Sequence, residues 1–208
     1  MVQGVAGLHD SSFRVEGDRI VAGTYGAAVV AAGGEALLRG ICPSDLKVPL
    51  EEFQKAGAAV DADEKNRQIR ICMGKRPLPL LIKTEPYPGF PTDLQSPFMA
   101  FLATAQGTSY IEEQVFEGRF ATAKILEQMG AVIRTEDQRA VIEGHYPLKG
   151  AAVNACDLRG GAALMVAALA AEGDTFIGEC HHIERGYEDI CRDMAALGAH
   201  IRWVGKDS

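Results

Sequence analysis

Charged side chains stand at the points where the sequence predicts helices to begin. Asp93 follows a proline-rich approach, Phe90-Pro91-Thr92, and precedes a strongly apolar segment. The positive end of a helix dipole would keep this carboxylate ionised near neutral pH, so that it could accept a proton or bind a sugar hydroxyl. The same position suits an ordinary helix N-cap made by Thr92 or Asp93. The residue type alone leaves both interpretations open.

Arginines occupy comparable positions. Arg119 and Arg185 each precede a predicted helix, and Arg159 stands near the start of another, beside Asp157. A cation at a helix N-terminus opposes the dipole and costs from a few tenths to about 1 kcal/mol, and such exceptions are expected at functional sites. Three guanidinium groups beside free N–H groups would bind phosphate and carboxylate. Glutamates close by in sequence leave open the alternative of ordinary surface ion pairs.

The elements that must position these side chains recur three times along the chain. Two series of glycines mark equivalent positions: Gly34, Gly107 and Gly173, and then Gly57, Gly130 and Gly198. Each copy is predicted to run strand, helix, strand, helix, strand, strand, and the copies span about 18–74, 75–146 and 147–204. In the middle copy these elements are expected at 80–83, 94–105, 108–112, 120–129, 132–135 and 140–143.

The first helix of each copy is apolar on nearly all sides, at 26–32, 98–105 and 162–171, whereas the second helices carry charge along one face. A helix without a polar face must be buried on all sides. Three such helices can be enclosed only if the sheets lie outside them. The sequence therefore predicts an α/β (α+β) fold, an inside-out α/β barrel of three repeated βαβαββ units with pseudo-threefold symmetry.

The third copy is incomplete. Its last predicted strand is the run 200–204, and the chain ends where the other copies continue into a further strand. An unpaired sheet edge is a liability that proteins normally cover. We therefore expect this chain to be part of a longer protein.

The composition indicates one compact domain over residues 1–208, with 47% hydrophobic and 24% charged residues. A net charge of −7 without a Lys/Arg cluster argues against nucleic acid as a partner. No apolar run approaches the roughly 20 residues that a membrane span needs, and no secretion signal is recognisable. The five cysteines are scattered, which argues against zinc and a disulfide framework and favours a reducing cytoplasm.

Four segments, in this order and spacing, resemble the C-terminal half of the UDP-N-acetylglucosamine enolpyruvyl transferase family, and the resemblance covers about residues 17–204. They are Phe90-Pro91-Thr92-Asp93, Phe116-Glu117-Gly118-Arg119-Phe120, Asp157-Leu158-Arg159 and Ile183-Glu184-Arg185-Gly186-Tyr187-Glu188. The resemblance implies a two-domain enzyme that transfers enolpyruvyl from phosphoenolpyruvate to the 3-hydroxyl of UDP-N-acetylglucosamine, the first committed step of peptidoglycan synthesis. It implies addition and elimination of phosphate with neither metal nor organic cofactor.

The same resemblance implies roles for individual residues. The expected catalytic residues are Asp93 as the base toward the 3-hydroxyl, Asp157 as an acid near the reacting carbons, and Arg159 and Arg185 beside the charges of phosphoenolpyruvate. The expected substrate-binding residues are Thr92, Asp93, Val115, Phe116 and Arg119.

Two departures and two alternatives accompany the resemblance. The chain has Gly118 where the family often has Asn, and Gly160 in place of Ala. It also lacks the family's N-terminal strand with its Lys-Asn pair, and the other domain with its mobile loop that bears Cys or Asp and a further Arg. We therefore expect the chain alone to be inactive, and to self-associate through the sheet edge that the missing strand leaves open. The alternatives are the shikimate-pathway enolpyruvyl transferase, which uses 3-phosphoshikimate, and a non-catalytic binding or assembly module of the same fold.

Overall fold

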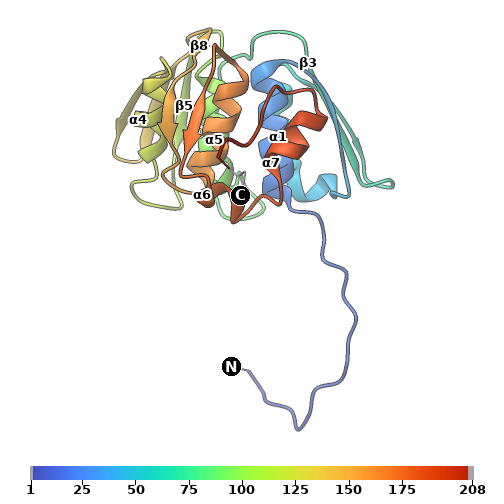
Figure 1. Cartoon of the computed structure of the whole chain (residues 1–208). Helices are drawn as coiled ribbons and strands as arrows, with labels where there is room; N and C mark the ends of the chain where they lie inside the picture. The colour runs from blue at the N-terminus through green and yellow to red at the C-terminus, as the bar shows by residue number, and fades with distance from the viewer. Residues whose placement is uncertain (1, 206–208) are drawn as a thin grey trace.

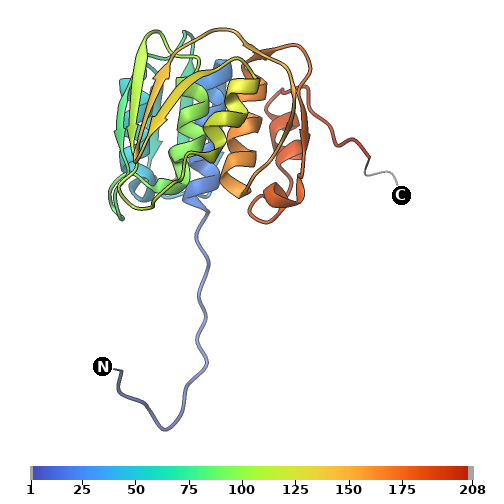
Figure 2. The same ribbon diagram turned by 90° about the vertical axis from the view of Figure 1, so that its left-hand side faces the viewer.

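Three apolar helices lie at the centre of the molecule: α1 (Arg19–Ala32), α3 (Gln95–Leu102) and α5 (Leu158–Leu169). The structure is a computed structural model that describes residues 2–205. Each of the three helices packs against the other two, and every residue of α3 is buried. Figures 1 and 2 show these helices side by side in the middle, with strands outside them. A helix without a polar face requires this burial.

The strands form two larger sheets and two short pairs. The first sheet has the order β1-β3-β2 and is antiparallel, with β1 (Gly34–Arg39), β2 (Ala59–Asp63) and β3 (Gln68–Met73). The second has the order β4-β5-β7-β6, with β4 (Leu81–Lys83), β5 (Thr108–Glu112), β6 (Val132–Glu136) and β7 (Arg139–Glu143). The parallel pairs are β8 (Leu148–Lys149) with β10 (Ala171–Glu172), and β9 (Ala152–Asn154) with β11 (Phe176–Gly178).

The remaining helices carry a polar face toward solvent. They are α2 (Lys47–Lys55), α4 (Ala121–Gln128), α6 (His181–Glu184) and α7 (Ile190–Ala196), together with the 3₁₀ turns η1 (Pro43–Leu46) and η2 (Thr92–Leu94). The mixed α/β class and the order of elements in the middle copy are confirmed. No helix within residues 2–205 combines the length and apolar character needed to cross a membrane.

Close packing around α1 fixes the position of η2. A Cβ atom at Gly26 would lie only 2.6 Å from Cε2 of Phe53, so a larger residue there would force α1 away from its neighbours. One turn earlier, Gly23 faces the side chain of Leu94, which is the last residue of η2 and is fully buried. The ring of Phe53 in turn stacks on Phe98 of α3, with centroids 4.8 Å apart. The turn that bears Asp93 is therefore anchored on the core.

The two ends of the chain differ from the expected repeat. Among residues 2–205 no strand precedes α1, although β4 and β9 precede α3 and α5, so β1 has a partner only on its β3 side. Residues 2–18 are mostly exposed and lead away from the body (Figure 1). The strand expected at 200–204 is also wrong, because this segment has no strand assignment. Ile201 and Trp203 of this segment pack against the core.

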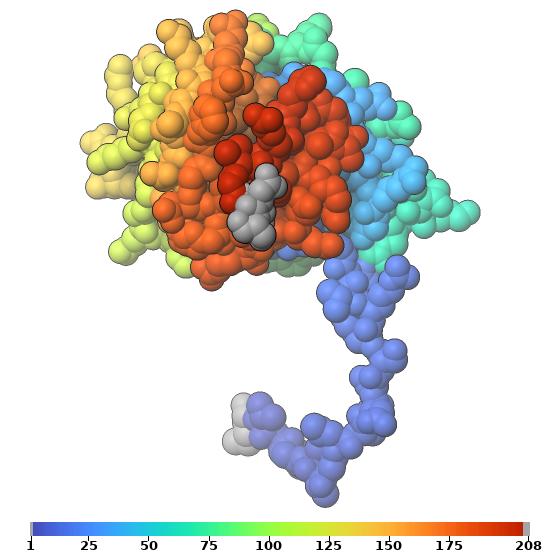
Figure 3. Space-filling model, in the orientation of Figure 1, coloured from blue at the N-terminus to red at the C-terminus, as the bar shows by residue number. Residues whose placement is uncertain are grey.

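A hollow of about 440 Å³ lies between α5, β11, α7 and the residues that follow α7. Figure 3 shows this face of the molecule, with the described residues after α7 in dark red. Its lining is mainly apolar and includes Met165, Phe176 and Trp203. None of the residues expected to do chemistry lines it. The hollow therefore lies apart from the candidate site.

Candidate active site

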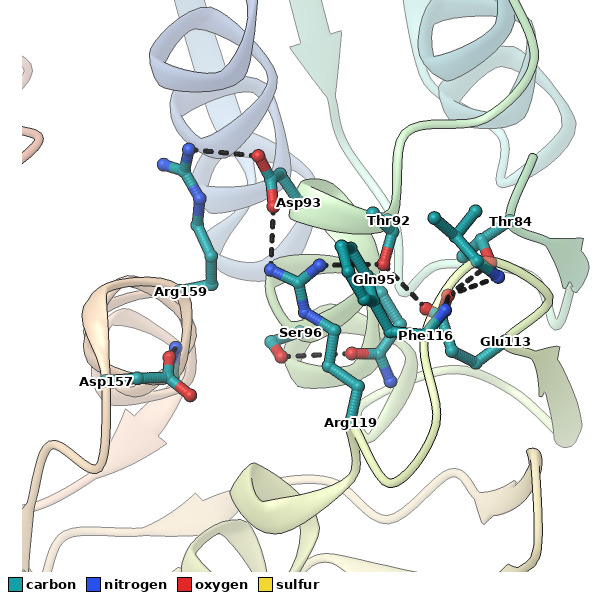
Figure 4. A network of polar contacts seen from close by, with 12 residues as sticks. Thr84, Thr92, Asp93, Gln95, Ser96, Glu113, Phe116, Arg119, Asp157 and Arg159 are labelled. Carbon is teal, nitrogen blue, oxygen red and sulfur yellow. Dashed lines mark hydrogen bonds and ion pairs between the residues drawn. The ribbon is translucent and has the colours of Figure 1, made fainter. Parts of the chain in front are cut away.

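Asp93 lies in η2, where the chain turns into α3, but its side chain makes no capping hydrogen bond. The carboxylate accepts hydrogen bonds from Nη2 of Arg119 at 2.7 Å and from Nη2 of Arg159 at 3.2 Å (Figure 4). The interpretation of Asp93 as an ordinary N-cap is therefore wrong. Its two oxygens each contact a different guanidinium group.

The two arginines reach Asp93 from the starts of two different helices. Arg119 stands one residue before Phe120, the N-cap of α4, and Arg159 is the second residue of α5. The packing of α3 against α5 and α4 brings these helix starts together. The side chains of Asp93, Arg119 and Arg159 are 37%, 25% and 17% exposed. The cluster is thus shielded from water on one side and open to a ligand on the other.

The charges around Asp93 set its protonation. Burial raises the pKa of Asp93, but the hydrogen bond from Arg119 and the charges of Arg159 and Arg119 act in the opposite direction and hold the pKa below its ordinary value. The carboxylate is therefore ionised at neutral pH. While both arginines contact it, Asp93 is also a weak proton acceptor.

This lowered pKa makes a prediction for stability. A carboxyl group whose pKa is lower in the folded state stabilises the fold above its unfolded pKa of about 3.9, and this contribution disappears as the pH falls through the folded-state pKa. We expect the stability difference between the chain and its D93N variant to shrink as the pH is lowered from 7 to below about 4. Urea unfolding at each pH measures it, and a difference independent of pH would contradict the observed ion pairs.

A buried carboxylate that the sequence analysis missed lies behind this cluster. Glu113 directly follows β5 and is only 1% exposed, and its side chain accepts hydrogen bonds from the hydroxyl groups of Thr84 and Thr92, each at 2.8 Å. The backbone N–H groups of Val115 and Phe116 also donate to it, at 3.0 and 3.1 Å. The strand alternation that buries Ser109 and Ile111 continues to this residue and was the signal that could have identified it.

The loop that follows Glu113 presents the expected sugar-binding residues. Val115 is half-buried, and the ring of Phe116 is 53% exposed. The guanidinium carbon of Arg119 lies 5.0 Å from the centroid of that ring, a cation–π arrangement. Thr92 accepts a hydrogen bond from Nη1 of Arg119 at 2.9 Å. The structure therefore brings Thr92, Asp93, Phe116, Arg119 and Arg159 together.

Asp157 makes a different contact from Asp93. Its carboxylate caps α5 by accepting a hydrogen bond from the N–H of Gly160 at 2.6 Å, and the residue is exposed. The neighbouring thiol of Cys156 lies 3.7 Å from Asp157. Burial, and next the charge of Asp157, raise the pKa of this thiol. The Cys156 side chain is therefore a neutral thiol and not a thiolate nucleophile at neutral pH.

The expected position of Arg185 at the start of a helix is wrong. Arg185 follows the single-turn helix α6, and α7 begins only at Ile190, with Asp189 as its N-cap. A cation after the last turn of a helix interacts favourably with the helix dipole, so the position of Arg185 carries no energetic cost that would indicate a functional site. Arg185 is exposed, and within residues 2–205 no hydrogen bond or ion pair joins it to the cluster around Asp93. Two of the three arginines therefore meet in this structure.

Comparisons with known proteins show the family to which this chain belongs. A sequence model of the family described as EPSP synthase (3-phosphoshikimate 1-carboxyvinyltransferase) matches residues 1–194. The chain belongs to the EPSP synthase family. Curated members from Brucella ovis and Brucella canis, each named UDP-N-acetylglucosamine 1-carboxyvinyltransferase, are 42% identical over 204 residues, which is 98% of this chain and 47% of each relative. The chain thus spans about half the length of these relatives.

Solved structures from the EPSP synthase family have a similar fold. The enolpyruvyl transferase NikO from Streptomyces tendae is 30% identical, with a TM-score of 0.80 over 90% of this chain and 44% of its own. An EPSP synthase from Acinetobacter baumannii is 20% identical, with a TM-score of 0.68 over 93% of this chain and 45% of its own. The second likeness supports the fold alone.

Proposed function

We propose that this chain is the C-terminal half of a two-domain enzyme that transfers enolpyruvyl from phosphoenolpyruvate to the 3-hydroxyl of UDP-N-acetylglucosamine. The observation that carries the proposal is the half-buried Asp93 carboxylate between two guanidinium groups at helix starts. Such a site combines a proton acceptor with a binding site for anions. The names of the Brucella relatives supply the acceptor sugar.

In this proposal the residues divide into two sets. Asp93 accepts the proton of the 3-hydroxyl as the hydroxyl oxygen bonds to the central carbon of phosphoenolpyruvate and a proton adds to its methylene carbon, which becomes a methyl group. Loss of a proton from this methyl group, together with departure of inorganic phosphate, then restores the double bond. Arg159 and Arg185 stabilise the carboxylate and phosphate charges, and Asp157 lies near the reacting carbons. Thr92, Val115 and Phe116 bind the nucleotide sugar, and Arg119 lies with Arg159 and Arg185 around the phosphoenolpyruvate and phosphate charges. No metal or organic cofactor takes part.

Anion binding and proton acceptance are linked at this site. An incoming phosphate or carboxylate competes with Asp93 for the guanidinium groups of Arg119 and Arg159. When an arginine turns to the anion, Asp93 loses a contact that lowers its pKa, and its pKa rises. Asp93 is therefore a weak base in the free protein and becomes a stronger base when the anionic substrate is bound.

The proposal extends to the rest of the molecule. The three central helices and their outer strands form an inside-out barrel of three βαβαββ units with pseudo-threefold symmetry, and the missing domain supplies the other wall of the cleft. The role is in peptidoglycan synthesis, and thus in cell shape and division. The location is the cytoplasm, where the five cysteines would remain reduced.

The 208-residue chain alone should fold without catalysing the reaction. With contacts from one wall only, its affinity for UDP-N-acetylglucosamine should fall to the millimolar range, about −4 kcal/mol of binding free energy. The open side of β1 should also favour strand-mediated self-association. Phosphate release with both substrates, together with light scattering over a concentration series, measures both effects. Turnover by the isolated chain would refute the two-domain proposal, and a strict monomer would refute the role of the edge.

A second candidate is the transfer of enolpyruvyl to 3-phosphoshikimate, which the description of the matching family model favours. Titration of the ¹⁵N-labelled chain with each acceptor separates the two. We expect UDP-N-acetylglucosamine to shift the amide resonances of Val115 and Phe116 at millimolar concentrations, with a smaller response to 3-phosphoshikimate. The reverse order would favour the second candidate, and a response to neither would favour a non-catalytic module.

A further inference from the structure

Glu113 is a buried charge whose contacts all require an acceptor. Its Oε1 atom accepts hydrogen bonds from the Thr84 hydroxyl and from the N–H groups of Val115 and Phe116, and its Oε2 atom accepts one from the Thr92 hydroxyl. Burying a carboxylate is costly unless donors of this kind satisfy it. Figure 4 shows Glu113 facing Thr84 and Thr92, on the far side of Thr92 from Asp93. The side chain thus joins the strand end, the turn η2 and the loop of Phe116.

The chemistry of the groups fixes the direction of each hydrogen bond. A hydroxyl group has one proton, and Thr92 donates it to Glu113 at 2.8 Å. The Thr92 oxygen is therefore an acceptor toward Nη1 of Arg119 at 2.9 Å. The Nη2 atom of the same guanidinium group donates to Asp93 at 2.7 Å. A directed series of hydrogen bonds runs from Asp93 through Arg119 and Thr92 to Glu113.

This direction explains why the position holds a carboxylate. A glutamine has one acceptor oxygen and an NH₂ group that only donates. With its oxygen toward Thr84 and the two N–H groups, its NH₂ would face Thr92 and force the hydroxyl proton to turn elsewhere. In the other orientation the NH₂ would face two backbone donors and expel the loop. No orientation of glutamine satisfies all four contacts.

We propose that Glu113 is a positioning residue for the site around Asp93. Glu113 accepts the hydrogen bond from the Thr92 hydroxyl, so that the Thr92 oxygen can only accept hydrogen bonds from Arg119 and from the ligand. In this way it aligns Arg119 on Asp93. It also holds the Phe116 loop beside that arginine. The consequence for substrate recognition is that a group of the acceptor sugar that contacts Thr92 must be a donor, either a hydroxyl or an N–H. This inference deepens the proposed function and rests on it.

The experiment compares Glu113→Gln with a matched control, Glu112→Gln. Glu112 precedes Glu113 in sequence but is half-buried and pairs with two exposed side chains, Lys83 at 2.9 Å and Arg139 at 3.7 Å, and ion pairs with exposed partners contribute little. The first measurement uses the 208-residue chain and does not depend on activity. Carbon-13 NMR of the side-chain carboxyl follows the titration of Asp93. We expect E113Q to raise the Asp93 pKa because Arg119 loses its alignment, and E112Q to leave it unchanged.

The second measurement is steady-state kinetics on the full-length protein that the proposed function implies. We expect E113Q to lower kcat by roughly tenfold or more, as small misplacements of catalytic groups do, and E112Q to stay within about twofold, as loss of an exposed ion pair should. Unchanged Asp93 titration and kcat in a folded E113Q would overturn the inference. So would a loss of kcat that only parallels a lower Tm. An inactive wild type would refute the proposed function, whereas the Asp93 titration would still decide the role of Glu113.

If E113Q does not fold, Thr92→Val and Thr92→Ser take its place. Both substitutions keep Glu113, but only serine keeps the hydroxyl that links Glu113 to Arg119. We expect Thr92→Val to raise the Asp93 pKa and Thr92→Ser to restore it close to that of the wild type. Equal titration of Asp93 in the two variants would overturn the inference.

Discussion

Replacing Asp93 with asparagine should remove most of the turnover of the full-length protein and leave its fold intact. Asparagine has nearly the same shape but cannot accept the proton of the acceptor hydroxyl, and general base catalysis contributes about 10²- to 10⁴-fold. Because Asp93 makes no capping hydrogen bond, the substitution disturbs only two partly exposed ion pairs. We therefore expect the Tm to change by a few degrees, the size that about 1 kcal/mol produces.

Asp61→Asn is the matched control for this experiment. Asp61 lies in β2, is exposed and stands far in sequence from the site, so its substitution should change neither turnover nor Tm. Steady-state kinetics and thermal unfolding are measured on both variants and on the wild type. If D93N keeps its turnover but unfolds at a much lower temperature, Asp93 is a structural residue and the proposed base is wrong.

Replacing Arg159 with alanine should lower kcat/KM by about 10²- to 10³-fold, which is the usual effect of removing one group that stabilises charge in the transition state. Arg159 is the least exposed member of the cluster, at 17%, and stands in the first turn of α5 beside Asp93. Contacts between charges that are shielded from water are worth more than exposed ones. Alanine would also leave Asp93 with one guanidinium partner and a higher pKa.

Arg134 provides the control for this second prediction, because its side chain is 78% exposed and forms a surface ion pair with Glu143. R134A should retain nearly full kcat/KM. We make the same prediction for R185A as for R159A, since closure of a second domain would bring the exposed Arg185 to the anion. A loss below about twofold for both R159A and R185A would contradict the proposed anion site, because it is far below the 10²-fold effect expected.

Local sequence patterns were sufficient for the central part of the fold. The absence of a polar face predicted the burial of α1, α3 and α5. The periodicity of apolar residues, together with the glycines that end helices, predicted the strands and helices of the middle copy. The strand expected at 200–204 failed because strand formation depends on a paired neighbour, which the pattern of one segment does not reveal. The run has the required composition, but β11 pairs with β9 alone.

The site was predictable only in part, because local patterns identify candidate residues but do not show which of them meet in the fold. Charges at helix starts pointed to Asp93, Arg119 and Arg159, which lie far apart in sequence and meet in the structure. The rule misplaced Arg185, because the short helix α6 ends before it. Glu113 was missed because an acidic pair at a strand end is typical of a solvated surface. Glu113 differs from Glu112 only in that it continues the series of alternate residues of β5 whose side chains are buried.

The central claim is that this chain carries Asp93 and its arginines as one wall of an enolpyruvyl transferase site. The most direct test is release of inorganic phosphate from phosphoenolpyruvate by the full-length protein, measured with UDP-N-acetylglucosamine, with 3-phosphoshikimate and with no acceptor. We predict phosphate release that requires UDP-N-acetylglucosamine and is lost in D93N. Release that requires 3-phosphoshikimate instead, or that proceeds equally well in D93N, would contradict this account.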